Sequence, residues 1–196
     1  MTTKILVCLA PGTEELEAIT VIDILERAKF DVTIASTAFD GSLTMKAAQR
    51  VMLTADVKLV DVADEEFNCI VLPGGLKGSE NFRDSTLLIE LLKQQKDDGK
   101  WVAAICAAPA IVLQHHNIYP AALMTCYPAL MHHIPEQNRR VKRVFTDVLN
   151  NLITSQGPGS ALEFAMEIVT QFGGKELTAQ LATELGTLPT LNYHKI

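Results

Sequence analysis

A single cysteine stands where an apolar run meets a proline-containing segment. The stretch WVAAICAAPA, residues 101–110, places Cys106 directly after a predicted buried strand and just before a predicted helix. This junction resembles a nucleophile elbow, although the G-x-S-x-G signature is missing. The free N–H groups and positive dipole end of the helix favour thiolate over thiol. We therefore predict that Cys106 is a nucleophile with a lowered pKa rather than a small buried hydrophobe. The same reasoning predicts Cys8 and Cys69, inside apolar strands, to be structural thiols.

Glu17 is the second candidate for chemistry. We expect Thr13 to be the N-cap of a helix over residues 14–28, in which first-turn carboxylates suit the helix dipole. Glu17 heads a stripe of apolar residues at helical spacing, and this stripe continues through Val21, Ile24 and Ala28. A buried carboxyl without a cation tends to keep its proton and can donate a hydrogen bond to a thiolate at Cys106. The periodicity equally allows a surface position for Glu17.

Two consecutive glycines, Gly74 and Gly75, follow another predicted strand. Glycine lets backbone N–H groups approach a ligand closely, so the N–H groups of Gly75 and Ala107 could form an oxyanion hole. Glycine turns are common, and the spacing of a phosphate-binding P-loop is missing here. The glycine pair therefore supports a site only together with Cys106.

The composition limits the classes of function. The chain has 196 residues, 48% of them hydrophobic, which predicts one soluble domain over residues 1–196. A net charge of −6 argues against nucleic-acid binding, and we expect the one dense cationic run to be a solvated face (Arg139, Arg140, Lys142, Arg143). The sequence contains no signal peptide and no apolar run long enough for a membrane span, so we expect a cytoplasmic protein.

The cysteines and histidines do not predict a metal site. Four cysteines lie far apart without a CxxC pair, so we expect free thiols, with no zinc site and no disulfide framework. His132 and His133 would face different directions in a helix, which argues against a metal pair. We expect neither a metal nor a cofactor.

Short apolar runs alternate with longer segments of helical period. We predict strands within residues 5–10, 32–36, 69–75, 101–106 and 152–155, and helices over 14–28, 85–99, 108–116 and 159–174, the last ended by glycine. Residues 39–62 suggest an antiparallel excursion or edge hairpin. This alternation predicts an α/β protein with a parallel sheet covered on both faces. The three candidate segments then meet at the carboxyl ends of the strands, where such folds place their sites.

Four segments together resemble a known family. LVCLAPGTEELEAIT, IVLPGGLKGSENFRDS, VAAICAAPA and LITSQGPGSALEFAMEIV, in this order and at these separations, resemble the ThiJ/PfpI superfamily. Within it they are similar to the branch of bacterial YajL and the human parkinsonism-associated protein deglycase. The resemblance covers nearly the whole chain.

This resemblance implies a fold, an assembly and an activity. The fold would be flavodoxin-like, a three-layer α/β/α sandwich with a mostly parallel sheet, and the protein a homodimer. Cys106 would be the oxidation-sensitive nucleophile, Glu17 the protonated carboxyl beside it, and Gly75 and Ala107 the backbone donors. The substrates would be methylglyoxal and glyoxal, or their adducts on proteins and nucleotides. The family's alternative role is redox-dependent chaperoning of unfolded proteins, in which Cys106 is oxidised.

The sequence departs from the family pattern at several positions. Tyr127 stands where the human member has a histidine near the cysteine, which puts a base from that side in doubt. Gln49 aligns with the family's arginine, and Ala47 replaces the cysteine of the same loop, so dimer contacts there do not carry over. We expect Tyr127 to border the pocket with Gly74. Cys126, in a predicted short strand over residues 123–126, then points to the other face as a bystander.

Overall fold

A seven-stranded sheet forms the centre of the molecule. The computed structural model describes residues 2–186, and its sheet has the strand order β5-β2-β1-β6-β7-β9-β8. All neighbouring strands are parallel except β8, which runs antiparallel to β9 at one edge. The strands are β1 (Lys4–Leu9), β2 (Asp31–Ser36), β5 (Val57–Lys58), β6 (Cys69–Leu72), β7 (Trp101–Ile105), β8 (Val144–Asp147) and β9 (Leu152–Ser155). A separate antiparallel pair, β3 (Thr44–Lys46) and β4 (Met52–Thr54), lies within the predicted excursion.

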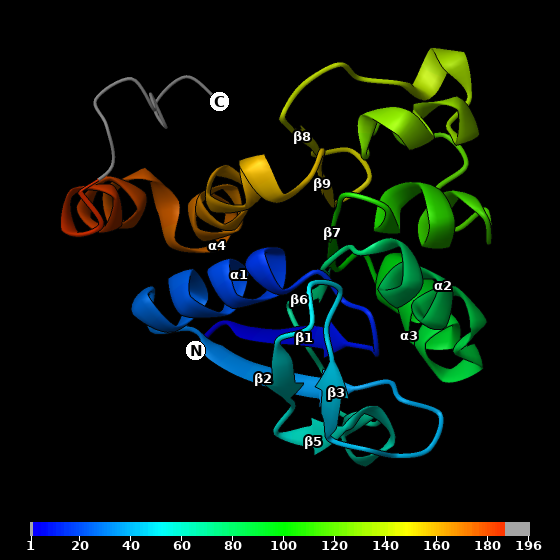
Figure 1. The fold of residues 1–196 in the computed structure, drawn as a ribbon. Coiled ribbons are helices and arrows are strands. Elements are labelled where there is room, and N and C mark those ends of the chain that lie inside the picture. The colour runs from blue at the N-terminus through cyan, green and yellow to red at the C-terminus, as the bar shows by residue number, and fades with distance from the viewer. Residues whose placement is uncertain (1, 187–196) are drawn as a thin grey trace.

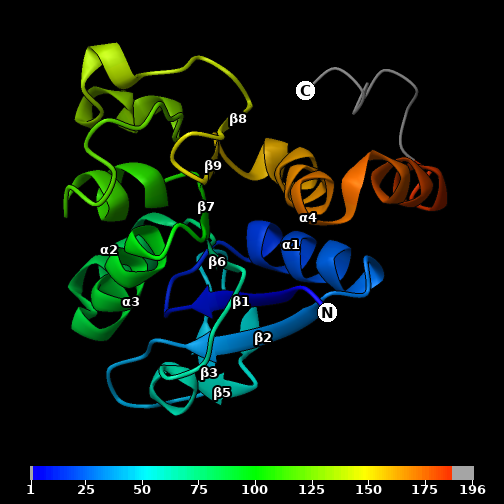
Figure 2. The same cartoon turned by 180° about the vertical axis from the view of Figure 1, so that it is seen from behind.

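Helices cover both faces of this sheet (Figures 1 and 2). Helices α1 (Glu15–Arg27) and α4 (Ala161–Glu184) pack on one face, and α2 (Leu76–Asp84) and α3 (Thr86–Asp97) cover the other. The shorter helices are η1 (Leu59–Val62), the π-helix η2 (Pro109–Gln114), η3 (Pro128–His133), η4 (Glu136–Asn138) and η5 (Pro158–Ser160). The predicted three-layer architecture with a mostly parallel sheet is confirmed.

Strand alternation divides the core into two apolar layers. Successive strand side chains point to opposite faces, so Ile5 and Val7 pack with α1 and α4 while Leu6 and Cys8 pack with α3. Because both faces are covered, β1 and β6 are continuous apolar runs rather than alternating ones.

The structure adds to the predicted elements at one position and differs at another. Gly174 breaks the last helix, as expected, with φ 82° and ψ 170°, but a second helical segment, which was not predicted, follows it as far as Glu184. The hydroxyl of Thr178 donates to the carbonyl of Gly174 at 3.0 Å, which supports this restart. Residues 123–126 do not form a strand and contribute only an isolated bridge between Met124 and Arg139.

Two further elements were not predicted, and one has a different form. Helix α2 follows the glycine pair directly, and β8 adds an antiparallel edge. The helix expected over residues 108–116 is a six-residue π-helix over Pro109–Gln114. No helix of the described residues is long and apolar enough to cross a membrane.

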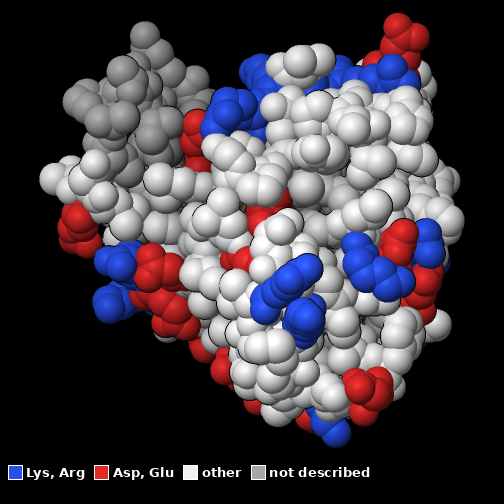
Figure 3. Space-filling model, viewed as in Figure 1, with Lys and Arg blue, Asp and Glu red and all other residues white. Residues whose placement is uncertain are grey.

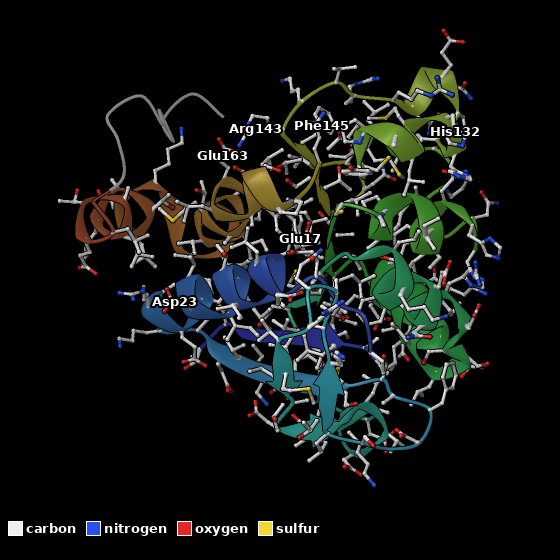
Figure 4. All side chains as sticks on the ribbon, viewed as in Figure 1. Glu17, Asp23, His132, Arg143, Phe145 and Glu163 are labelled. Carbon is white, nitrogen blue, oxygen red and sulfur yellow. The ribbon has the colours of Figure 1, made fainter. Side chains whose placement is uncertain are left out.

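The cationic run lies at the surface, as predicted. Lysine and arginine side chains gather at the upper edge of the face shown in Figure 3. Arg140 and Lys142 each lie 5.8 Å from the centroid of the Phe145 ring. Arg143 forms an ion pair with Glu163 at 2.7 Å, and the two are labelled side by side in Figure 4.

Candidate active site

Cys106 lies at the carboxyl end of β7 in a strained backbone conformation. Its φ is 64°, in the left-handed region that residues other than glycine rarely adopt. Its N–H donates to the carbonyl of Ser155 at 2.9 Å, and its carbonyl accepts from the N–H of Tyr127 at 2.7 Å. These two hydrogen bonds hold the strained turn, as the surroundings of such residues must. The predicted elbow geometry is therefore present.

The glycine pair packs directly against this turn. A side chain on Gly74 would clash with the Cβ of Cys106 and with the carboxyl of Glu17. Gly75 has φ 85°, and a side chain there would clash with the carbonyl of Gly12. The backbone N–H groups of Gly75 and Ala107 lie close enough to the Cys106 sulfur to lower the pKa of its thiol. The structure thus places both expected backbone donors at the thiol.

Glu17 is fully buried at the start of α1, in the interior of the molecule (Figure 4). Its Oε2 accepts from the N–H of Gly74 at 2.6 Å, and its side chain lies close enough to the Cys106 thiol for the two groups to influence each other's pKa. Its other oxygen, Oε1, is buried and has no hydrogen-bond partner among the described residues. The stripe expected below Glu17 is buried as well, which excludes the alternative surface position.

The expected N-cap is wrong. Glu14 caps α1, since its Oε2 accepts from the N–H of Glu17 at 2.8 Å. The Thr13 hydroxyl instead accepts from the N–H of Ala10 at 2.9 Å and tightens the turn after β1. The Glu14 N–H also donates to the carbonyl of Gly74. Together with the bond from the Gly74 N–H to Glu17, this fixes α1 to the glycine turn.

Burial and charge decide whether Glu17 or Cys106 holds the proton at this site. Burial raises the pKa of Glu17 to about 8, the N–H of Gly74 opposes this rise, and the nearby charge of Glu14 adds to it. At neutral pH Glu17 is therefore mostly protonated. The neighbouring Cys106 thiol slightly opposes the rise in the Glu17 pKa, as a donor to the carboxylate would. When Glu17 is protonated, the same sulfur is the neighbouring group that can accept its proton in a hydrogen bond.

Burial, charge and the backbone N–H groups have opposing effects on the pKa of the Cys106 thiol. Burial raises the pKa of Cys106 to about 12, and an ionised Glu17 contributes to that rise, while the N–H groups of Gly75 and Ala107 lower it. The predicted lowering is therefore wrong for the site with Glu17 ionised. A protonated Glu17 removes the repulsive charge and donates to the sulfur instead. A lowered pKa of the Cys106 thiol stays a prediction for the site in which Glu17 is protonated.

Two neighbouring segments form the edge of the site. Tyr127 is 45% exposed, and a side chain added at Gly157 would lie 3.6 Å from its ring and 4.0 Å from the Cys106 sulfur. Gly157 therefore leaves space beside the thiol, which is itself 8% exposed. Sequence analysis assigned no role to Ser155 or Gly157. The signal for both was the turn TSQGPGS, which follows a strand at the same edge of the sheet.

The other three cysteines differ from Cys106. Burial raises the pKa of Cys8 to about 12 and also raises that of Cys69, and neither thiol receives the backbone donors that Cys106 has. Cys126 is fully buried in the opposite apolar layer, where its thiol donates to the carbonyl of Tyr127 at 3.4 Å. All four are free thiols, and the layers support the bystander interpretation of Cys126.

No metal centre is present among the described residues. The rings of His132 and His133 lie 4.2 Å apart, so the expectation that they face different directions is wrong. No group of three ligating side chains that could hold a metal ion forms around them or elsewhere in residues 2–186.

The loop that contains Ala47 and Gln49, two positions that depart from the family pattern, is fixed to α1. The N–H of Gln49 donates to both carboxylate oxygens of Glu15, at 2.8 and 2.9 Å, and Ala47 is buried. Glu15 thus binds the backbone of the loop, whatever side chain Gln49 carries. The homodimer and the cytoplasmic location stay predictions.

Removing the charge of Glu17 should change how stability depends on pH. The pKa of Glu17 rises from 4.5 to about 8 on folding, so its ionisation opposes folding, and wild-type stability should fall as pH rises through this range. Glu17→Gln should lose this part of the pH dependence and gain stability relative to the wild type between pH 5 and 8. Urea unfolding across this range measures the difference, with Glu26→Gln at an exposed position of the same helix as the control. A constant difference between Glu17→Gln and wild type would contradict the buried protonated carboxyl.

Comparison with known proteins agrees with this geometry. Residues 3–171 match the DJ-1/PfpI family. Protein DJ-1 homolog B of Arabidopsis thaliana is 43% identical over 92% of this chain, which spans 40% of that relative's length. Glutathione-independent glyoxalase DJR-1.2 of Caenorhabditis elegans is 33% identical over 92% of this chain and 94% of its own.

A solved structure is also similar over nearly its whole length. The oxidized DJ-1 of Toxoplasma gondii has a TM-score of 0.90 and 38% identity, and the match covers 94% of this chain and 98% of that one. The strained cysteine turn, the glycine pair and the buried carboxyl all lie within residues 3–171, which match the DJ-1/PfpI family. This chain is a member of the DJ-1/PfpI family.

Proposed function

We propose that this protein is a cysteine-dependent glyoxalase or deglycase, with methylglyoxal, glyoxal or their adducts as substrates. The observation that carries the proposal is the thiol of Cys106, which has two backbone N–H donors and a buried, protonated Glu17 beside it. The name of the glyoxalase relative from Caenorhabditis elegans supports it.

The arrangement can convert methylglyoxal without a cofactor. The thiolate of Cys106 attacks the aldehyde carbon, and a C–S bond forms while the carbonyl oxygen takes the proton of Glu17. The N–H groups of Gly75 and Ala107 stabilise the negative charge at this stage. The Glu17 carboxylate then removes the hydrogen of the attacked carbon as a proton, which leaves an enediolate. The hydroxyl proton moves from the oxygen of the attacked carbon to the neighbouring oxygen, and Glu17 returns its proton to the neighbouring carbon. This transfer leaves a lactoyl thioester, which water hydrolyses to lactate and the free thiol.

The same steps apply to adducts on proteins and nucleotides. In an adduct the aldehyde carbon already carries a hydroxyl and an amine. The C–S bond forms as the C–N bond breaks, and the amine leaves with the proton of Glu17; the later steps are the same. The opening beside Tyr127 and Gly157 is the path by which such a larger substrate reaches the thiol. A protective role in carbonyl and oxidative stress follows from removal of these aldehydes.

Lactate formation from methylglyoxal by purified protein tests the catalytic proposal. Cys106→Ser should abolish turnover, and Glu17→Gln should reduce kcat about a hundredfold or more, because a positioned acid and base is lost. Cys126→Ser, which removes a buried sulfur from the other layer, should retain wild-type turnover. Equal activity of Cys106→Ser and wild type would exclude this chemistry.

We also propose a second candidate function, a redox-sensing holdase that binds unfolded proteins when Cys106 is oxidised. The observation that favours it is the similarity to a Toxoplasma gondii relative described as oxidized. In this account the sulfur becomes a sulfinate, and the backbone donors with Glu17 stabilise its oxygens.

Mild hydrogen peroxide should add two oxygens to Cys106 and leave Cys8 and Cys69 reduced. The reason is that these two thiols are fully buried and have no stabilising donors. Peptide mass spectrometry identifies the oxidised residue, and suppression of aggregation of an unfolded client protein before and after oxidation measures holdase activity. Preferential oxidation of Cys8 or Cys69, or a main Cys106–Cys126 disulfide, would contradict this account.

A further inference from the structure

Gly157 lies beside the candidate nucleophile in a conformation that does not require glycine. Its φ of 162° and ψ of −169° are extended backbone, outside the left-handed region that favours glycine. A Cβ at this position would meet only two atoms within 4 Å, Cδ2 of Tyr127 at 3.6 Å and Sγ of Cys106 at 4.0 Å. Both are ordinary van der Waals distances. Neither the backbone nor the packing therefore explains why this position has no side chain.

The other glycines near the site differ from Gly157. Gly74 and Gly75 are required by packing, because a Cβ on either one would clash with neighbouring backbone or side-chain atoms. Gly159, in the same turn as Gly157, also has no such requirement, but it is exposed and a Cβ there would meet no atom within 4 Å. Gly157 alone of these four leaves an unfilled space that borders the sulfur of Cys106.

Hydrogen bonds that involve no side chain at position 157 hold this turn in place. The N–H of Gly157 donates to Oγ of Ser160 at 3.2 Å, and its carbonyl accepts from the Ser160 N–H at 2.8 Å. The Ser160 hydroxyl also pairs with that of Ser155 at 2.7 Å, and the Ser155 carbonyl accepts from the N–H of Cys106 at 2.9 Å. Because the turn is tied to Cys106 in this way, a methyl group added at position 157 would stay beside the sulfur.

The space next to Gly157 is free of the groups assigned to the chemistry. Neither Glu17 nor the N–H groups of Gly75 and Ala107 lie within 4 Å of the position that a Cβ would take. The half-exposed ring of Tyr127 forms the facing wall. A reacting carbon must come within about 3–3.5 Å of the sulfur, so the group attached to that carbon needs room close by. A methyl group 4.0 Å from the sulfur would compete for this room.

We propose that Gly157 sets the size of the substrates that react at Cys106. The space left by its missing side chain, against the Tyr127 ring, holds the part of the substrate beyond its two reacting carbons. It admits α-oxoaldehydes whose substituent is larger than methyl, and the adducts of such aldehydes with amines. This inference rests on the proposed glyoxalase or deglycase function. It makes Gly157 a determinant of specificity rather than a catalytic residue.

Turnover of methylglyoxal and phenylglyoxal by the full chain tests this role. The two aldehydes differ by a phenyl group in place of methyl, and the wild type should convert both, to lactate and to mandelate. Gly157→Ala should lower the ratio of kcat/KM for phenylglyoxal to that for methylglyoxal about tenfold, the effect of a methyl-sized change in a pocket. Gly159→Ala adds the same methyl group at an exposed position of the same turn and should leave this ratio unchanged.

Alkylation of Cys106 gives a readout that does not require turnover. Iodoacetamide and iodoacetanilide react with a thiolate by the same displacement and differ by one phenyl ring, so the ratio of their rates is independent of the thiolate fraction. Peptide mass spectrometry follows each reaction at Cys106. The ratio of the anilide rate to the amide rate should fall in Gly157→Ala and stay unchanged in Gly159→Ala. Tyr127→Ala removes the facing wall and should raise the ratio, both alone and together with Gly157→Ala.

The outcomes separate the role of Gly157 from the proposed function. If the wild type converts neither aldehyde, the proposed function fails, and the alkylation ratio alone decides the role of Gly157. If the wild type converts both and Gly157→Ala leaves both ratios unchanged, the role of Gly157 is overturned and the proposed function stands. Equal losses in Gly157→Ala and Gly159→Ala also overturn it. If Gly157→Ala does not fold, an unchanged alkylation ratio in Tyr127→Ala overturns it.

Discussion

One buried site contains both an acid and a thiol, and it can stabilise only one negative charge. Glu17 and Cys106 lie side by side with little access to water, so ionising both would place two like charges in a region of low dielectric. One proton is therefore shared between them. If Glu17 takes a proton from one substrate carbon and returns it to the neighbouring carbon, the pair performs chemistry that otherwise needs a cofactor.

Backbone geometry makes this shared site possible. Three chain segments meet at the carboxyl edge of the sheet, and Gly74 lies between the other two with no space for a side chain. Glu14 holds α1 to the same turn through its N–H and caps the helix with its carboxylate, so the position of Glu17 depends on the glycine turn. The charge of Glu14 also helps Glu17 to keep its proton. A residue that caps a helix thus contributes to the protonation state of the site.

Much of this arrangement could be predicted from the sequence. The alternation of apolar runs and helical periods indicates the parallel sheet, and Cys106, Glu17 and the glycine pair follow from their places after predicted strands. The N-cap could not be predicted, because threonine is the preferred residue type there, yet the Thr13 hydroxyl is used in the turn after β1 and Glu14 caps the helix instead. The helical segment after the break at Gly174 was also not predicted. The role of Gly157 was also missed, since only the three-dimensional structure brings its turn beside the sulfur. The pKa of Cys106 depends on burial and on the charge of Glu17, which is distant in sequence but adjacent in space, and periodicity specifies neither.

The pKa of Cys106 in the wild type and in Glu17→Leu tests the central claim most directly. Ultraviolet thiolate absorbance against pH measures it, with Cys8→Ala, Cys69→Ala and Cys126→Ala backgrounds used to isolate the signal of Cys106. If Glu17 is protonated and donates to the sulfur, its replacement by leucine removes a donor and raises the thiol pKa. If Glu17 is ionised, the same replacement removes a negative charge and lowers the pKa, and that result would contradict the account.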